Sequence, residues 1–163
     1  MKIVNNALYP KTTFKYAVIV FFCSLFLHEI CNLFISTIHF NPDELGAISA
    51  AAKLAGYDWE TIWNYEQSYY GSVFGLIYTP LFLYVDDPFV LYQIMLLIVA
   101  IVHSISSIFS FLILKDELKG ENIKYVMCAA IACSFFTAWR ATNVMNEAIL
   151  ILCVWVGFFA LYQ

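Results

Sequence analysis

The chain has 163 residues, of which 63% are hydrophobic and only 12% are charged, and its mean hydropathy is +0.78. This composition excludes an ordinary soluble domain and indicates an integral membrane protein. The formal net charge of −4 gives no sign of nucleic-acid binding. Because the apolar runs are continuous and do not alternate with polar residues, they predict membrane helices and not a barrel.

The first feature along the chain is a polar lead, residues 1–15, with three lysines, followed by an apolar run at 16–40. That run is long enough to cross a bilayer. A secretory signal peptide is the alternative, but the run is longer than a typical signal hydrophobic region and ends without a small-x-small cleavage site. We therefore expect a cytoplasmic lead and a retained first transmembrane helix.

The next segment has the signals of a capped helix. Asn41 can accept hydrogen bonds from the first free N–H groups, and Pro42 suits the first helical position. Asp43 and Glu44 oppose the positive end of the helix dipole, and Gly56 can end the helix. The pattern predicts a weakly amphipathic helix that lies on the membrane, with Ser49 and Lys53 away from its apolar stripe. The apolar stripe consists of Leu45, Ile48, Ala52 and Ala55.

A short apolar piece, residues 73–85, decides the topology. It has thirteen residues and is broken by Pro80, and this length is marginal for crossing a bilayer. If it does not cross, the three lysines of the lead and the three lysines of residues 115–124 lie on the same, cytoplasmic side. Six of the eight basic residues are then inside, as the positive-inside rule expects. If it crosses, the second lysine group lies outside. We expect a re-entrant or surface-lying segment.

The predicted fold is an all-α polytopic membrane protein with about four transmembrane helices, a juxtamembrane helix and a re-entrant or surface-lying apolar segment in the first outer loop. We expect it in the bacterial plasma membrane, or in the endoplasmic reticulum of a eukaryote. The predicted regions are 1–15 (cytoplasmic lead), 16–40 (first span), 41–88 (outer loop), 89–114 (second span), 115–124 (cytoplasmic loop), 125–138 (third span), 139–147 (outer loop) and 148–163 (fourth span).

The order of these parts resembles the amino-terminal part of polytopic GT-C glycosyltransferases. An outer Asp43-Glu44 pair opens a juxtamembrane helix that continues through Ala50-Ala51-Ala52 to Gly56-Tyr57-Asp58-Trp59, followed by a broken apolar piece, two spans and a second outer acid. GT-C enzymes are the relatives of protein O-mannosyltransferases and aminoarabinose transferases that use lipid-linked sugars. The resemblance implies that Asp43 is the first-loop catalytic carboxylate, with Glu44 beside it, and that Glu147 is the second-loop acid.

The chain departs from this family in two respects. The Lys-Pro-Pro-Leu element of close relatives of the aminoarabinose enzymes is replaced by Tyr69-Tyr70-Gly71 and Tyr78-Thr79-Pro80-Leu81, which leaves the acceptor class open. Such enzymes also run to several hundred residues. We therefore expect an amino-terminal fragment of a transferase that is inactive on its own.

The resemblance implies transfer of a sugar from a polyprenyl-phosphate donor to a hydroxyl of a glycan, lipid or protein acceptor. Asp43 would take the acceptor proton, and Arg140 and Lys53 would hold the departing phosphate, Arg140 with the better geometry. A divalent ion such as Mg²⁺ or Mn²⁺ between Asp43 and Glu147 would suit oxygen ligands, but two carboxylates are too few to argue for one. Alternatively, the acids only favour helix starts, and Arg140 only anchors a helix at the interface.

A second group of polar residues lies inside the predicted spans, where ionisable groups are costly and usually paired. It consists of His28, Glu29, Asn32 and His103. A proton or ion relay in a small transporter-like or non-enzymatic membrane protein is one interpretation, and polar contacts that join helices are the other.

Overall fold

The computed structural model describes residues 11–38, 42–59, 72–118, 121–135 and 147–163, and the regular structure in these ranges is entirely α-helical. The predicted all-α class is thereby confirmed. The helices are α1 (Lys11–Leu33), α2 (Pro42–Leu54), α4 (Ser72–Tyr84), α5 (Pro88–Glu117), α6 (Ile123–Phe135) and α8 (Glu147–Tyr162).

Two of these helices, α1 and α5, are long and apolar enough to cross a membrane, over 21 and 30 residues respectively. The described parts of α6 and α8 are apolar but shorter, with 13 and 16 residues. The predicted count of about four spans therefore stays a prediction, whereas two candidate spans are present.

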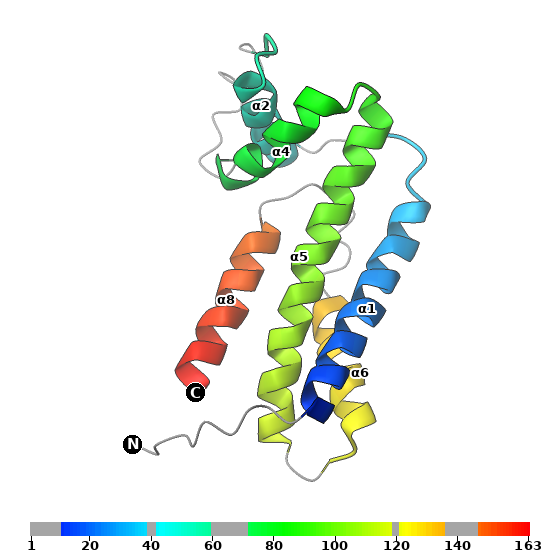
Figure 1. Cartoon of the computed structure of the whole chain (residues 1–163), viewed down its shortest axis with the longest axis vertical. Coiled ribbons are helices and arrows are strands. Elements are labelled where there is room, and N and C mark those ends of the chain that lie inside the picture. The colour runs from blue at the N-terminus through cyan, green and yellow to red at the C-terminus, as the bar shows by residue number, and fades with distance from the viewer. Residues whose placement is uncertain (1–10, 39–41, 60–71, 119–120, 136–146) are drawn as a thin grey trace.

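The centre of the bundle is α5, which packs against α1, α6 and α8. In Figure 1, α1 and α6 run toward the end where α2 and α4 lie, and α5 and α8 run back from it. At the opposite end, Lys115 Nζ of α5 donates a hydrogen bond to Thr13 Oγ1 of α1 at 2.6 Å. The structure thus brings the start of α1, the end of α5 and the start of α6 to one end, as the proposed topology requires. Which end faces the cytoplasm stays a prediction.

The short apolar segment forms α4, which packs mainly on α2 and only slightly on α5. Figure 1 shows α4 together with α2 at one end of the bundle, across the direction of α5. This placement is the one that a surface-lying segment would have. That this segment does not cross the bilayer stays a prediction.

The start of α5 shows how local sequence defines this end of the bundle. Asp87 is its N-cap, and one carboxylate oxygen accepts hydrogen bonds from the N–H groups of Phe89 and Val90 at 2.8 and 2.9 Å. Pro88 occupies the first helical position, where no N–H is needed. Asp87 and Pro88 therefore define where the turn after α4 ends and α5 begins. α5 extends slightly beyond the predicted span of 89–114 at both ends.

The first span differs from its predicted limits of 16–40. The described part of α1 begins at Lys11, inside the lysine-bearing lead and five residues before the predicted start of the span. It ends at Leu33, and Ile35 N–H bonds to the Asn32 carbonyl at 3.0 Å in a tightened last turn. Residues 35–38 are all β-branched or serine, which favour helices less.

The outward faces of α1 and α8 carry large apolar side chains that are well exposed, among them Phe14, Phe26, Leu150 and Leu161. Water is a poor solvent for so much contiguous apolar surface, whereas lipid tails accommodate it. These faces support the assignment to a membrane.

The interface of α5 with its neighbours is rich in buried serines. Ser104 and Ser107 donate to carbonyls of their own helix, those of Ala100 and Ser104, both at 2.7 Å. Ser110 donates to its own helix and also, at 3.4 Å, to the Ala130 carbonyl of α6. The hydroxyls are satisfied locally, and their small size lets neighbouring helices approach closely.

Candidate functional site

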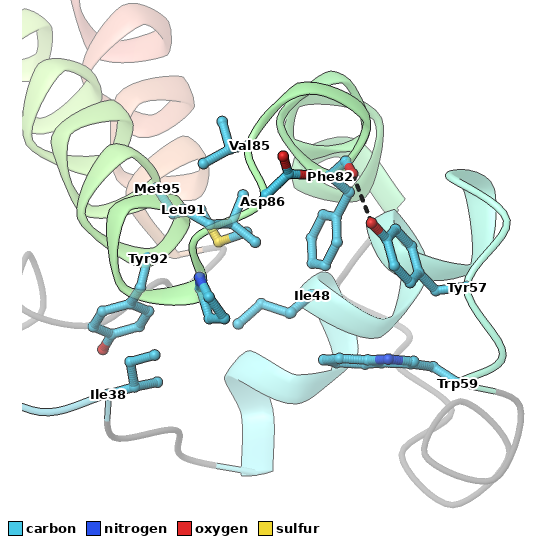
Figure 2. Close-up of a pocket in the computed structure, with 11 residues that line it drawn as sticks. Ile38, Ile48, Tyr57, Trp59, Phe82, Val85, Asp86, Leu91, Tyr92 and Met95 are labelled. Atoms are coloured by element: carbon cyan, nitrogen blue, oxygen red, sulfur yellow. Dashed lines mark hydrogen bonds between the residues drawn. The ribbon is translucent and has the colours of Figure 1, made fainter.

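A pocket of about 360 Å³ lies where α2, α4 and the start of α5 meet (Figure 2). Its walls are mostly apolar and aromatic, with Asp86 as the one carboxylate among the lining residues. Pockets of this kind bind ligands chiefly through their apolar surface and orient them with a few polar groups. The lining residues are Ile38, Ile48, Tyr57, Trp59, Phe82, Val85, Asp86, Pro88, Leu91, Tyr92 and Met95.

Three aromatic side chains form one wall of this pocket. Tyr57 and Trp59 each meet the ring of Phe82 edge to face, with centroid separations of 5.9 and 6.1 Å. Tyr57 Oη also donates a hydrogen bond to the Phe82 carbonyl at 3.2 Å, shown dashed in Figure 2. That carbonyl belongs to the last turn of α4, where carbonyls lack partners within the helix. Tyr57 therefore caps α4 and shapes the pocket at once.

The position of Tyr57 depends on how α2 ends. Gly56 has φ +93°, and its N–H bonds to the Lys53 carbonyl while the Tyr57 N–H bonds to the Ala52 carbonyl, both at 3.0 Å. This pair of bonds is a Schellman motif, which requires a left-handed residue at the position of Gly56. The predicted stop at Gly56 is confirmed, and the described part of α2 begins at Pro42, while the predicted cap Asn41 lies outside the described residues.

The predicted polar side of α2 is partly wrong. Ser49 is fully buried and donates a hydrogen bond to the Gly46 carbonyl at 3.1 Å, although it was placed away from the apolar stripe. The buried arc is wider than predicted because α2 packs on α4, and its Ile48 and Ala51 share a core cluster with Ala148 of α8. The helix is thus enclosed on more than one side, and its serine is satisfied by its own backbone.

The acidic pair lies in the first turn of α2. The backbone of Asp43 is helical, but its side chain lies outside the described part of the structure. Glu44 is fully buried. It lies on the same helical face as Ile48, one turn further along α2.

Glu44 acts on two tyrosines of other helices. Tyr78 of α4 and Tyr92 of α5 are both buried, and the Glu44 carboxylate interacts electrostatically with both phenols. Burial first, and then the negative charge of Glu44, raise the pKa of Tyr78 well above its ordinary 10.0. Both effects disfavour the phenolate, so Tyr78 keeps its proton.

The other predicted site residues are only partly placed. α8 begins at Glu147, whose side chain is outside the described residues, but the next residue, Ala148, packs in the core cluster with Ile48 of α2. Lys53 is exposed in the last turn of α2. Arg140 lies outside the described residues. The structure therefore brings the starts of α2 and α8 to one end of the bundle.

The polar residues within the spans come together across α1 and α5. The rings of His28 and His103 have centroids 5.5 Å apart with their planes inclined by 30°, and both residues are buried. Asn32 Nδ2 donates to Glu29 Oε1 at 3.1 Å one turn further along α1. The four residues thus form a ring pair next to a hydrogen-bonded pair.

Within the described ranges there is no group of three or more His, Cys, Asp or Glu side chains that could hold a metal ion. Asp43 and Glu147, predicted as ligands of a divalent ion if one binds, lie in helices whose backbone is described but their side chains are not, so their joint binding of a divalent ion stays a prediction. The cysteines of the described part are all free of disulfide bonds.

Comparison with protein-family models, with curated proteins and with solved structures finds no match to this chain. What the site does is therefore argued from its own residues. Sequence reasoning missed the pocket itself, including Asp86 and Phe82. The signal was present in Tyr57 and Trp59, two aromatic residues directly after the helix stop at Gly56.

Proposed function

We propose that this chain forms the amino-terminal part of a membrane glycosyltransferase of the GT-C type, which moves a sugar from a polyprenyl-phosphate donor to an acceptor hydroxyl at the outer face of the membrane. The main support is that the acidic start of α2 and the start of α8 at Glu147 lie at one end of the bundle, beside an aromatic pocket. Lys115, Lys124 and the start of α1 lie at the other end.

In this proposal the carboxylate of Asp43 accepts the proton of the acceptor hydroxyl. The acceptor oxygen forms a bond to the anomeric carbon, the bond from that carbon to the phosphate oxygen breaks, and polyprenyl phosphate leaves with the electron pair. A guanidinium matches the two oxygens of a phosphate better than an ammonium does, which favours Arg140 for this role.

Lys53 is less suited to the same phosphate. It lies ten residues after Asp43 on one helix, so their backbones are about 15 Å apart along the axis. A phosphate leaving a carbon that reacts beside Asp43 would therefore be distant from Lys53. We assign Lys53 a place at the membrane surface, where lysines contact lipid headgroups.

The test is Asp43→Asn in the native protein, assayed in membranes with a polyprenyl-phosphate sugar and acceptor. Turnover should fall by about two to four decades, because the amide cannot take a proton. Glu147→Gln should cost less, unless a metal bridges it to Asp43, in which case activity becomes more dependent on added Mg²⁺ or Mn²⁺. Glu121→Gln, an exposed carboxylate beside the start of α6, is the matched control and should be unchanged.

Wild-type turnover in the Asp43→Asn protein would return Asp43 to the role of a charged helix start. In that case the ring pair of His28 and His103, 5.5 Å apart between α1 and α5, would favour the second candidate function, a transporter-like membrane protein. Loss of proton-coupled uptake in His28→Gln vesicles, with Asp43→Asn vesicles unaffected, would support that alternative.

A further inference from the structure

The pocket between α2, α4 and the start of α5 has no role in the chemical steps proposed above. Its volume of about 360 Å³ is typical of a ligand pocket, and Asp86 is the one charged group among its described lining residues. Two apolar lining residues, Ile48 and Met95, are each 1% exposed and belong to the core, whereas Tyr57 is 49% exposed. The pocket therefore reaches from the surface to the core.

The walls and the size of this pocket favour an apolar chain as its occupant. Water in a cavity needs several polar partners, which apolar walls do not supply. A methylene group is about as large as a water molecule, roughly 30 Å³, so the pocket can hold on the order of ten methylene groups. That is part of one lipid chain.

The surface next to the pocket indicates where such a chain comes from. Large apolar side chains are exposed on both sides of Asp86 in the sequence, at the end of α4 and at the start of α5. They are Leu83, Tyr84, Phe89 and Val90. Exposed apolar side chains that gather in this way mark a surface that meets lipid or another protein. Since α1 and α5 are candidate spans, the occupant that we consider is a lipid of the surrounding bilayer.

The charge of the pocket determines which headgroup fits. Asp86 lies exposed in the turn between α4 and α5, and its neighbour Asp87 already accepts two backbone N–H groups as the N-cap of α5. No Lys, Arg or His is among the described lining residues, and Lys53, the basic residue of α2, is not one of them. A phosphate here would meet a carboxylate without a cation. An ammonium would be attracted by Asp86 and by the aromatic rings of the wall.

We propose that this pocket binds a bilayer lipid with an ammonium headgroup, of the phosphatidylethanolamine class. Part of one chain lies against Ile48, Phe82 and Met95, and the ammonium lies at Asp86 (Figure 2). This inference does not rest on the proposed function. The donor of the proposed reaction has an anionic head, whose phosphate we assign to Arg140, so the pocket is a separate lipid site.

The test uses Trp59 as a reporter, because it forms part of the pocket wall. Trp63→Phe, Trp139→Phe and Trp155→Phe together leave it as the single tryptophan. The protein is placed in phosphatidylglycerol bilayers with a minor fraction of chain-brominated phosphatidylethanolamine or chain-brominated phosphatidylglycerol, and bromine quenches tryptophan fluorescence on contact. Quenching should indicate an affinity about two- to fivefold higher for the ethanolamine lipid, the effect expected of one exposed ion pair.

Two changes separate the charge from the chain. Asp86→Asn should abolish the preference for ethanolamine, whereas Asp58→Asn, an exposed carboxylate that does not line the pocket, should keep it. Leu91→Phe fills the pocket and should weaken quenching by both lipids, whereas Leu97→Phe, on an exposed part of α5, should not. A protein with Trp155 of α8 as its single tryptophan should show no preference.

Equal quenching of Trp59 by the two lipids would overturn the ammonium assignment, as would stronger quenching by phosphatidylglycerol. Loss of the preference in Asp58→Asn as complete as in Asp86→Asn would also overturn it, because the effect would then come from the general surface charge. Asp86→Asn alters an exposed side chain, so it still decides the question where Leu91→Phe fails to fold. The assay measures no sugar transfer, so failure of the proposed function leaves its result unchanged.

Discussion

Replacement of Gly56 by alanine isolates the contribution of one backbone angle to the pocket. Gly56 has φ +93°, and a Cβ added there would meet no heavy atom within 4 Å. The destabilisation by Gly56→Ala therefore does not come from a steric clash with neighbouring groups. It comes from the backbone conformation that the new side chain must adopt. A left-handed conformation costs a residue with a Cβ about 1–2 kcal/mol. Because the Schellman bonds of Gly56 and Tyr57 hold the end of α2, this cost should fall on the last turn.

A cost of about 1–2 kcal/mol corresponds to a factor of roughly 5–30 in the population of the opened state. Amide exchange at residues 55–57 should therefore become faster by that factor in Gly56→Ala, measured in bilayers by mass spectrometry. Tyr57 should also lose part of its hydrogen bond to the Phe82 carbonyl, so the C-terminal turn of α4 should exchange faster as well.

Gly157 supplies a matched control within the same chain. It lies inside α8, and a Cβ added there also meets nothing within 4 Å. Its backbone is helical, so Gly157→Ala should stabilise α8 by about 0.5–1 kcal/mol through helix propensity. Equal behaviour of the two variants, or unchanged exchange at residues 55–57 in Gly56→Ala, would refute the conformational argument.

Three further predictions concern topology, a cap and alkaline stability. In a cysteine-free background, Glu66→Cys should react with an impermeant thiol reagent from outside the cell and Leu118→Cys should not, and labelling at position 118 would contradict the proposed orientation. Asp87→Ala should destabilise the start of α5 by about 1 kcal/mol in thermal unfolding, whereas the exposed neighbour variant Asp86→Ala should have little effect; equal losses would show that the cap does not matter. Because the pKa of Tyr78 is raised in the folded state, its contribution to stability is complete below pH 10.0 and decreases as the pH rises beyond it, so wild-type unfolding should become easier above that pH and Tyr78→Phe should flatten the dependence. Parallel curves for the two proteins would contradict this assignment.

The ends of several helices could be read from the sequence because they depend on neighbouring residues alone. Pro42 and Gly56 delimit α2 as predicted, and Asp87 and Pro88 open α5, since caps are satisfied by backbone groups within a few residues. The limits of α1 were predicted less well. Its end at Leu33 lies inside the apolar run of residues 16–40, where small differences in helix propensity decide, and its described start at Lys11 lies in the polar lead before that run.

The composition and the order of apolar runs were enough to determine the helical class and to suggest that the two lysine-bearing segments share one end, which the bond between Lys115 and Thr13 supports. Tertiary structure alone decided that Glu44 is buried, that Ser49 faces inward and that Tyr57, Trp59 and Phe82 form one wall of a pocket. The physical reason is distance along the chain. Tyr57 and Phe82 are 25 residues apart, so no local pattern records their contact, which arises only when α2 and α4 pack together at the end of α5.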